Sequence, residues 1–202
     1  MSHLLEPVKT EPLILHLSPT LSRMSEHEFF EFCQLNRDWR IERTCEGDLL
    51  IMPPTGGRTG KYNFALTGQF GAWVEADGSG IGFDSSTGFI LPNGAKRSPD
   101  LAWIRRSRWD ALSEEEKEEF PPLCPDFVVE LRSRSDSLRT LQAKMQEYID
   151  NGALLGWLID TKERKAYVYR PGTVVSCLDD PETLSGDPVL PGFVLELPRI
   201  WA

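Results

Sequence analysis

Two short apolar strand candidates, each carrying an acidic residue, constrain the fold of this chain more than any other feature. The first runs from Pro99 to Ile104 and the second from Asp126 to Arg132, and both are rich in β-branched and aromatic residues. Side chains alternate across a strand, so Glu130 and Arg132 share one face. If the two strands pair, the carboxylates of Asp100 and Glu130 come together. Two carboxylates at such a short distance need a cation, a shared proton or a basic partner.

An amphipathic helix is predicted directly after the second strand, from about Ser137 to Asp150. Asp136 is the expected N-cap, and Asn151-Gly152 is the expected stop signal. The apolar residues of this segment fall within an arc of roughly 100°. Lys144 lies at the border of that arc, where a lysine can rest its stem on the core and aim its ammonium at the edge of the sheet.

The rest of the chain predicts further helices and strands around this unit. Capping boxes and apolar residues at helical spacing indicate the helices, and apolar alternation between turn signals indicates the strands. The expected helices are 25–36, 59–76 and a short acidic one from Ser113, and the expected strands lie in 39–53, 81–84, 88–91, 154–160 and 165–170. The predicted fold class is α/β or α+β, with a mixed sheet flanked by helices.

Composition favours one domain. The 202 residues, 40% of them hydrophobic, are enough to bury a sizeable core. We expect an N-terminal arm over 1–20, which packs on its own domain or on a second subunit, and a single domain over 21–202 with its core at about 40–175. Four cysteines without a Cys-x-x-Cys pair, and no signal peptide, predict a cytoplasmic protein. No apolar run approaches the roughly 20 residues that span a bilayer.

Charge gives two opposing indications about a nucleic-acid partner. The net charge of -9 argues against a protein that holds DNA mainly by neutralising phosphates. Locally, however, Arg132, Arg134 and Arg139 gather close to Lys144 in the sequence. Arg134 and Arg139 are therefore candidate DNA-binding residues, and an ordinary solvated face is an equally good interpretation of the cluster.

Several motifs occur in a specific order over roughly residues 20 to 175. They are Ser85-Ser86-Thr87-Gly88-Phe89 with Leu91-Pro92, Ser98-Pro99-Asp100-Leu101-Ala102, Val129-Glu130 with Ser133, Lys144 with Tyr148, Asn151-Gly152, Gly156-Trp157-Leu158-Ile159-Asp160, and Val168-Tyr169-Arg170-Pro171-Gly172. In this order they resemble the Uma-type putative restriction endonuclease family, part of the PD-(D/E)-x-K nuclease superfamily. The resemblance implies a restriction-endonuclease-like fold, a mixed β-sheet flanked by helices.

The resemblance also implies a catalytic site. Asp100, Glu130 and the backbone carbonyl of Leu131 would hold Mg²⁺ or Mn²⁺, since oxygen ligands suit both ions. Arg132 stands where the superfamily has a lysine, and because arginine stays protonated it can clamp a phosphate but cannot act as a base. Lys144 would instead lie near the attacking water. The expected supporting residues are Asn63, Ser133 and Tyr148.

These residues predict a metal-dependent endonuclease that cleaves double-stranded DNA, with Asp100, Glu130, Arg132 and Lys144 as its catalytic residues. A homodimer is expected, because such folds often cleave a duplex with two sites. Two alternatives stay open: a catalytically silent interaction protein that retains the nuclease fold, and a hydrolase of another phosphodiester such as RNA or a nucleotide. Taken without the resemblance, Glu130 and Arg132 are better interpreted as a structural ion pair and Asp100 as a turn cap, and the resemblance reverses this preference.

Overall fold

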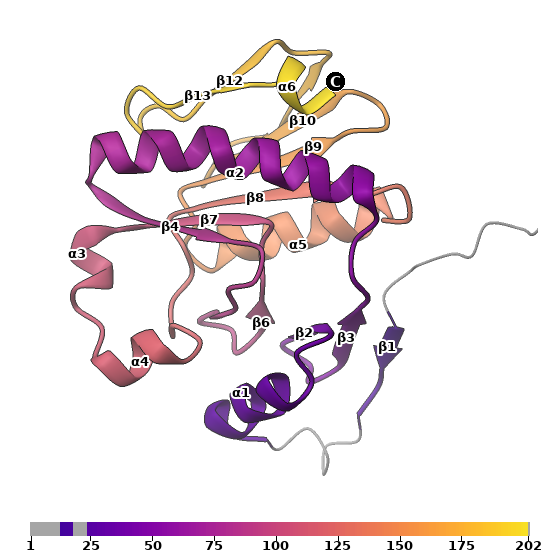
Figure 1. Cartoon of the computed structure of the whole chain (residues 1–202), viewed down its shortest axis with the longest axis vertical. Helices are drawn as coiled ribbons and strands as arrows, with labels where there is room; N and C mark the ends of the chain where they lie inside the picture. Colours follow the sequence, from indigo (N-terminus) through magenta and orange to yellow (C-terminus); the bar gives the residue numbers. More distant parts are fainter. Residues whose placement is uncertain (1–12, 18–23, 202) are drawn as a thin grey trace, which may run out of the picture.

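A six-stranded sheet forms the centre of the molecule in the computed structural model, which describes residues 13–17 and 24–201 (Figure 1). Its strands are β4 (Gly80–Asp84), β7 (Leu101–Arg105), β8 (Phe127–Arg132), β9 (Leu155–Asp160), β10 (Lys165–Tyr169) and β11 (Ser176–Asp179). They lie in the order β11-β10-β9-β8-β7-β4. Neighbours are antiparallel except β8 and β9, which are parallel, so the sheet is mixed.

A second, five-stranded sheet is antiparallel throughout. Its strands are β1 (Leu13–Leu15), β2 (Arg40–Arg43), β3 (Leu49–Met52), β5 (Phe89–Ile90) and β6 (Lys96–Arg97), in the order β1-β3-β2-β6-β5. Only residues 98–100 separate β6 from β7, so the chain passes from one sheet to the other there. Side chains from both sheets consequently meet around Asp100.

Two long helices cover the six-stranded sheet from opposite sides (Figure 1). They are α2 (Gly57–Asp77) and α5 (Leu138–Asp150), and α5 connects the parallel strands β8 and β9, which need a crossover of this kind. The other helices are α1 (Glu26–Leu35), α3 (Arg106–Trp109), α4 (Glu114–Glu118) and α6 (Pro198–Trp201). A two-stranded sheet of β12 (Thr183–Ser185) and β13 (Val194–Glu196) packs with α6 against α2.

Alternation along β8 divides the main core into two layers. Phe127, Val129 and Leu131 belong to the apolar cluster under α2. Val128 belongs to the cluster on the other face, where it packs with Met145 of α5. All five side chains are at most 3% exposed. This confirms the alternation predicted from the sequence and leaves the face of Glu130 turned toward α5.

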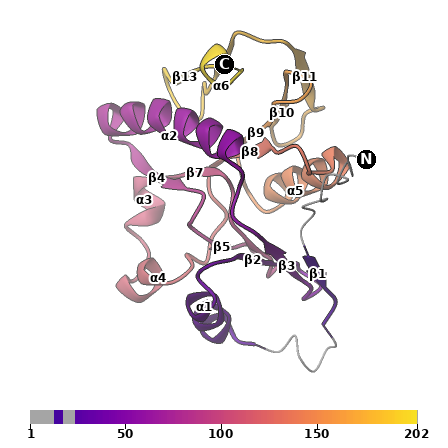
Figure 2. The same ribbon diagram turned by 45° about the vertical axis from the view of Figure 1, so that its right-hand side comes forward.

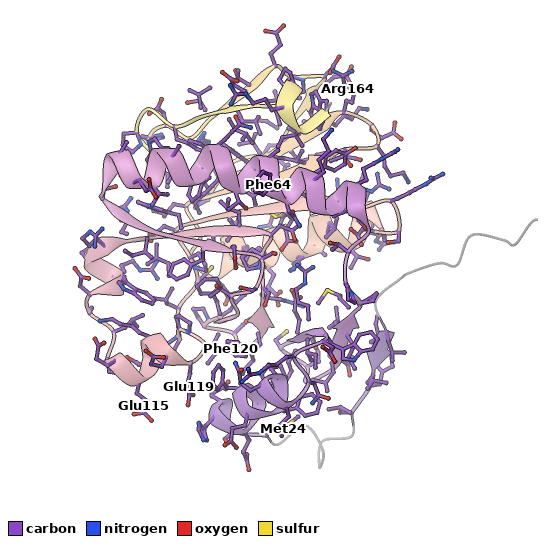
Figure 3. All side chains as sticks on the ribbon, in the orientation of Figure 1. Met24, Phe64, Glu115, Glu119, Phe120 and Arg164 are labelled. Atoms are coloured by element: carbon purple, nitrogen blue, oxygen red, sulfur yellow. The ribbon has the colours of Figure 1, made fainter. Side chains whose placement is uncertain are left out.

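A third apolar cluster attaches α1 to the five-stranded sheet, on the side of the molecule away from α2 (Figure 2). Phe120, which follows α4, packs against Phe29 and Phe30 with ring centroids 6.1 and 5.1 Å away. Glu119 precedes Phe120 in the chain (both labelled in Figure 3), and its Oε1 lies 2.5 Å from His27 Nδ1. The region is thus held by both apolar and polar contacts.

The predicted start of α5 needs one correction. The N-cap is Ser137, whose hydroxyl accepts a hydrogen bond from the Thr140 N–H at 3.4 Å. The Asp136 carboxylate instead accepts the Ser133 N–H at 2.7 Å and closes the turn between β8 and the helix. The prediction of Asp136 as the cap is wrong because two capping residues are adjacent here and the preceding turn recruits the first.

The predicted N-terminal arm falls largely outside the described residues. Within it, Leu13–Leu15 form β1, which pairs with β3 of the same chain. Among the helices that the structure describes, none combines the length and the apolar character needed to cross a bilayer.

Candidate active site

The junction of the two sheets brings Asp100 and Glu130 together. Leu101 lies across from Val129 in the antiparallel pairing of β7 and β8, so the next position along sets Asp100 across from Glu130. Both side chains are buried, with 6% and 2% of their surface exposed. Asp100 Oδ2 accepts a hydrogen bond of 2.8 Å from the Leu131 N–H, which fixes the carboxylate against β8. The two acids thus have the register that a shared site requires.

Lys144 reaches this pair from α5. Its Nζ lies 2.7 Å from Glu130 Oε1 and 2.8 Å from Glu42 Oε1. Tyr148, one helical turn further on, donates its hydroxyl to the same Glu130 oxygen at 3.1 Å. The two residues share a helix face because they are four positions apart. The border position predicted for Lys144 therefore does direct its ammonium at the acidic strand.

Glu42 is a third buried carboxylate, and the sequence analysis does not single it out. It lies on β2 and is 1% exposed. Besides Lys144, it accepts the Ser98 N–H at 3.1 Å and pairs with Arg97 Nη1 at 3.2 Å. The local signal was an acid inside a predicted strand, but that signal does not reveal which element packs against the strand.

Arg40, two residues before Glu42, holds Asp100. Its Nη1 lies 3.0 Å from Asp100 Oδ1, and its Nη2 lies 3.4 Å from Met52 Sδ. The Arg40 side chain is 29% exposed, so it stands between the buried acids and solvent. Each of the two acids therefore has its own cation, Arg40 on Asp100 and Lys144 on Glu130.

Burial and the neighbouring charges set the protonation of this cluster. Burial, helped by repulsion from Asp100, raises the pKa of Glu130 to about 7 despite the attraction of Lys144. Burial would also raise the pKa of Glu42, but Lys144 and two arginines lower it to about 2. Burial alone would lower the pKa of Lys144, yet Glu130 and Glu42 outweigh it and raise this pKa. Lys144 is therefore an ammonium that acts through its charge.

Arg132 is directed to a different partner. Its Nη1 lies 2.6 Å from Asp160 Oδ2 on the parallel strand β9, and its Nε donates to the Asp136 carbonyl at 3.2 Å. The ion pair that the sequence suggested for Arg132 and Glu130 is thus replaced by one with Asp160. The Ser133 hydroxyl lies 3.1 Å from that of Ser135, within the same turn. A phosphate clamp at Arg132 stays a prediction.

Comparison with known proteins identifies the family and the fold of the chain. Residues 27–198 match the family described as Uma2, putative restriction endonuclease. The chain belongs to the Uma2 family. A solved structure, a putative nuclease belonging to DUF820 from Anabaena variabilis, has a TM-score of 0.67 and 20% identity over 80% of this chain and 89% of that one. At this identity the likeness shows the fold, and it confirms the predicted mixed sheet flanked by helices. No curated protein matches the chain.

Within the described residues, the other expected site residues make no hydrogen bond or ion pair with Asp100, Glu130 or Lys144. Arg134 and Arg139 are exposed, beside the start of α5, and their contact with DNA stays a prediction. Asn63 lies on α2, and its Oδ1 is buried without a hydrogen-bond partner among the described residues. A buried acceptor of this kind is uncommon and leaves Asn63 able to take a donor.

The donor set suits a divalent ion by its chemistry. Two carboxylates and the Leu131 carbonyl are hard oxygen donors, and Mg²⁺ commonly takes one or two carboxylates together with water and substrate oxygens. The described part of the chain holds no group of three or more acidic, histidine or cysteine side chains arranged for a metal ion. Both Asp100 oxygens are engaged, one by Arg40 and one by the Leu131 N–H. An ion at Asp100 would therefore compete with the charge of Arg40 for the same carboxylate.

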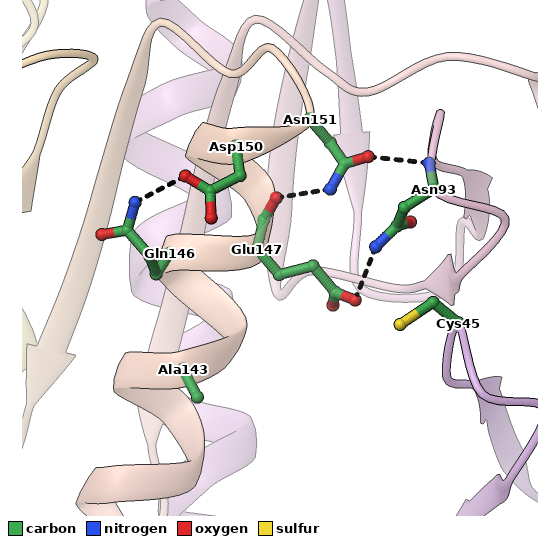
Figure 4. Close-up of a pocket in the computed structure, with 7 residues that line it drawn as sticks. All are labelled: Cys45, Asn93, Ala143, Gln146, Glu147, Asp150 and Asn151. Atoms are coloured by element: carbon green, nitrogen blue, oxygen red, sulfur yellow. Dashed lines mark hydrogen bonds between the residues drawn. The ribbon is translucent and has the colours of Figure 1, made fainter.

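A hollow of about 530 Å³ lies beside α5, and polar residues such as Asn93, Gln146 and Asp150 form much of its lining (Figure 4). Glu147 points across it and accepts a hydrogen bond of 3.0 Å from the Asn93 side chain. The other Glu147 oxygen lies 2.6 Å from Arg97 Nε, and Arg97 pairs in turn with Glu42. The wall of the hollow is thus linked to the acid cluster through one buried arginine.

Proposed function

We propose that the chain is a Mg²⁺- or Mn²⁺-dependent endonuclease that hydrolyses phosphodiester bonds in double-stranded DNA. Membership of the Uma2 family supports a putative nuclease. The contact that carries the proposal is the buried pair of Lys144 with Glu130, 2.7 Å long, with Asp100 across from Glu130 in the sheet. A fixed ammonium beside two carboxylates fits metal-assisted hydrolysis of a phosphodiester.

Each residue has a distinct part in this proposal. Asp100, Glu130 and the Leu131 carbonyl would hold the ion, and a bound ion would supply charge neutralisation at the phosphoryl oxygens and help for the nucleophile and the leaving group. Lys144 cannot act as a base while its raised pKa keeps it protonated, so it stabilises the negative charge that develops on the phosphate. Tyr148 orients Glu130 through its hydroxyl.

The remaining residues support the site from further away. We assign phosphate contacts outside the scissile bond to Arg134 and Arg139, because both are exposed, Arg139 in the first turn of the helix that carries Lys144 and Arg134 in the turn before it. Arg132 would have to leave Asp160 before it could clamp a phosphate. Its present contacts favour a role in holding the end of β8.

A plasmid assay tests the proposed activity. Wild-type protein should convert supercoiled plasmid to nicked or linear forms with Mg²⁺ or Mn²⁺ and should lose this activity with a chelator. Asp100→Asn and Glu130→Gln should each lower the rate by about a hundredfold or more, and Lys144→Met by a similar factor. Glu75→Gln, exposed on α2, is the matched control and should cleave normally. Cleavage at wild-type rates in both acid variants would contradict the assignment.

The same assay separates two alternative functions from the proposed one. The net charge of -9 favours a catalytically silent interaction protein that retains the nuclease fold, and such a protein would leave the plasmid intact with every ion. A hydrolase of RNA or nucleotides would cleave those substrates and spare the plasmid. Running all substrates with the same protein preparation separates these outcomes.

We also propose a homodimer that acts in a reducing cytoplasm. Two copies would supply one site for each strand of a duplex. The four cysteines are all free thiols, which agrees with a reducing compartment. Light scattering of the purified protein, alone and with duplex DNA, tests the dimer, and a monomer under both conditions would contradict it.

A further inference from the structure

Arg40 is the arginine that the structure sets against a candidate metal ligand. Its guanidinium donates to Asp100 Oδ1 at 3.0 Å, whereas Arg132 is bound to Asp160. The two arginines also differ in access, since 29% of the Arg40 side chain is exposed against 13% of Arg132. Arg40 therefore combines contact with the acid cluster and contact with solvent.

Arg40 is attracted by other carboxylates of the cluster as well as by Asp100. Burial would lower the pKa of Arg40, but attraction to Asp100, Glu42 and Glu130 raises it. Its guanidinium thus lies in the combined field of three carboxylates, which is where a divalent ion would also be most strongly attracted. Among the residues that the structure describes, the second nitrogen, Nη2, has only the Met52 sulfur as a partner, and this sulfur is a weak acceptor for a guanidinium.

We propose that Arg40 neutralises the acid cluster while no metal ion is bound. When a divalent ion binds, the Arg40 guanidinium leaves Asp100 and contacts the scissile phosphate. The inference rests on the proposed function. The planar guanidinium is suited to both partners, because its fork matches a carboxylate and a phosphate equally well. Release from Asp100 costs little when the arriving ion takes over the neutralisation of the carboxylate. The weak contact with Met52 leaves the other nitrogen free to turn with it.

Binding experiments test this inference without relying on cleavage. Arg40→Gln removes the competing charge, so calorimetric titration with Mn²⁺ alone should show binding about tenfold tighter than in wild type. The same variant should bind a duplex more weakly in Ca²⁺, with a salt dependence reduced by about one phosphate contact.

Arg40→Lys keeps the charge but lacks the forked guanidinium, so it should show wild-type Mn²⁺ affinity and weakened duplex binding. Arg37→Gln, exposed at the end of α1, is the matched control and should change neither quantity. Circular dichroism confirms that each variant is folded.

The outcomes separate this inference from the proposed function. If Arg40 only orients Asp100, Arg40→Gln will bind Mn²⁺ no more tightly than wild type does. That result overturns the inference about Arg40. The nuclease proposal stays intact as long as the wild-type protein binds the ion. Normal duplex binding by Arg40→Gln would overturn the phosphate contact. If neither wild type nor Arg40→Gln binds Mn²⁺, both proposals fail. Binding by Arg40→Gln alone would support the inference, and the plasmid assay would then decide the activity.

Discussion

Single buried charges determine the chemistry of this molecule, and Glu42 is the clearest case. A carboxylate in this position loses nearly all its water, at a cost of several kcal/mol. It is stabilised by Lys144 and Ser98 at one oxygen and by Arg97 at the other. Glu42 thereby neutralises Lys144 in part, and it also keeps Arg97 in place. Removing it would leave two buried cations short of a partner.

Glu42→Gln is expected to remove a pH-dependent part of the stability. Burial raises the pKa of Glu42, but Lys144 and Arg97 lower it by more, from 4.5 to about 2. A carboxyl group whose pKa is lower in the folded protein than in the unfolded chain stabilises the fold. This contribution is complete at pH values above the pKa of the unfolded chain, and it is lost as the pH falls through the pKa of the folded protein. The shift corresponds to about 3 kcal/mol between about pH 5 and pH 2.

Urea unfolding at a series of pH values measures this contribution. The difference in free energy of unfolding between wild type and Glu42→Gln should shrink as the pH falls below about 4.5. Glu75→Gln provides the comparison, because this exposed side chain on α2 lies outside the cluster. A wild-type advantage over Glu42→Gln that stays constant down to the acid limit would mean that Glu42 is not held as a carboxylate by these cations.

At the scale of elements, glycines decide how closely the sheet and its neighbours can approach. Gly80 on β4 lies against β7, where a Cβ would overlap the Trp103 ring and the Ile104 carbonyl oxygen. Gly68, inside α2, has nothing within 4 Å of the position of an added Cβ. Gly80→Ala should therefore lower the free energy of unfolding by about 1 to 3 kcal/mol. Gly68→Ala should raise it by about 0.5 to 1 kcal/mol, because alanine is the better helix former.

Thermal and denaturant unfolding of the two glycine variants test both predictions. The two variants carry the same chemical change, so a general effect of an added methyl group would shift both free energies of unfolding in the same direction. Opposite signs would support the close packing of β4 on β7. Equal stability of Gly80→Ala and wild type would show that the edge strand can move away from Trp103.

Elements with local signals could be predicted from the sequence, and contacts between distant elements could not. β7, β8 and α5 follow from apolar alternation and helical spacing, and the approach of Asp100 to Glu130 follows once the two strands pair. Arg40 lies 60 residues before Asp100 and meets it only because the chain bends between β6 and β7. No local pattern encodes that bend, so Arg40 and Glu42 were missed. Arg132 shares the predicted face with Glu130, but β9 supplies it with a closer acid.

At the scale of the whole molecule, the proposed function requires an acidic protein to bind an acidic polymer. The net charge is -9, and the short helix α4 adds a run of exposed and half-buried glutamates to one surface. Basic DNA-binding domains attract DNA over long distances through their net positive charge, and this protein has no such long-range attraction. Attraction has to arise locally, from exposed arginines and from a cation at the junction of the two sheets.

Duplex binding is accordingly expected to depend on a divalent ion. Without an ion, Arg40 and Lys144 are engaged by Asp100 and Glu130 and offer a phosphate little free positive charge, whereas a bound ion would add two positive charges at this position. The duplex affinity of the wild-type protein should therefore be about tenfold or more higher in Ca²⁺ than in chelator at matched ionic strength. Asp100→Asn should lose most of this gain, since it removes a ligand while leaving Arg134 and Arg139 in place. Fluorescence anisotropy with a labelled duplex measures both effects, and equal affinity with and without the ion would mean that DNA is bound away from the two acids.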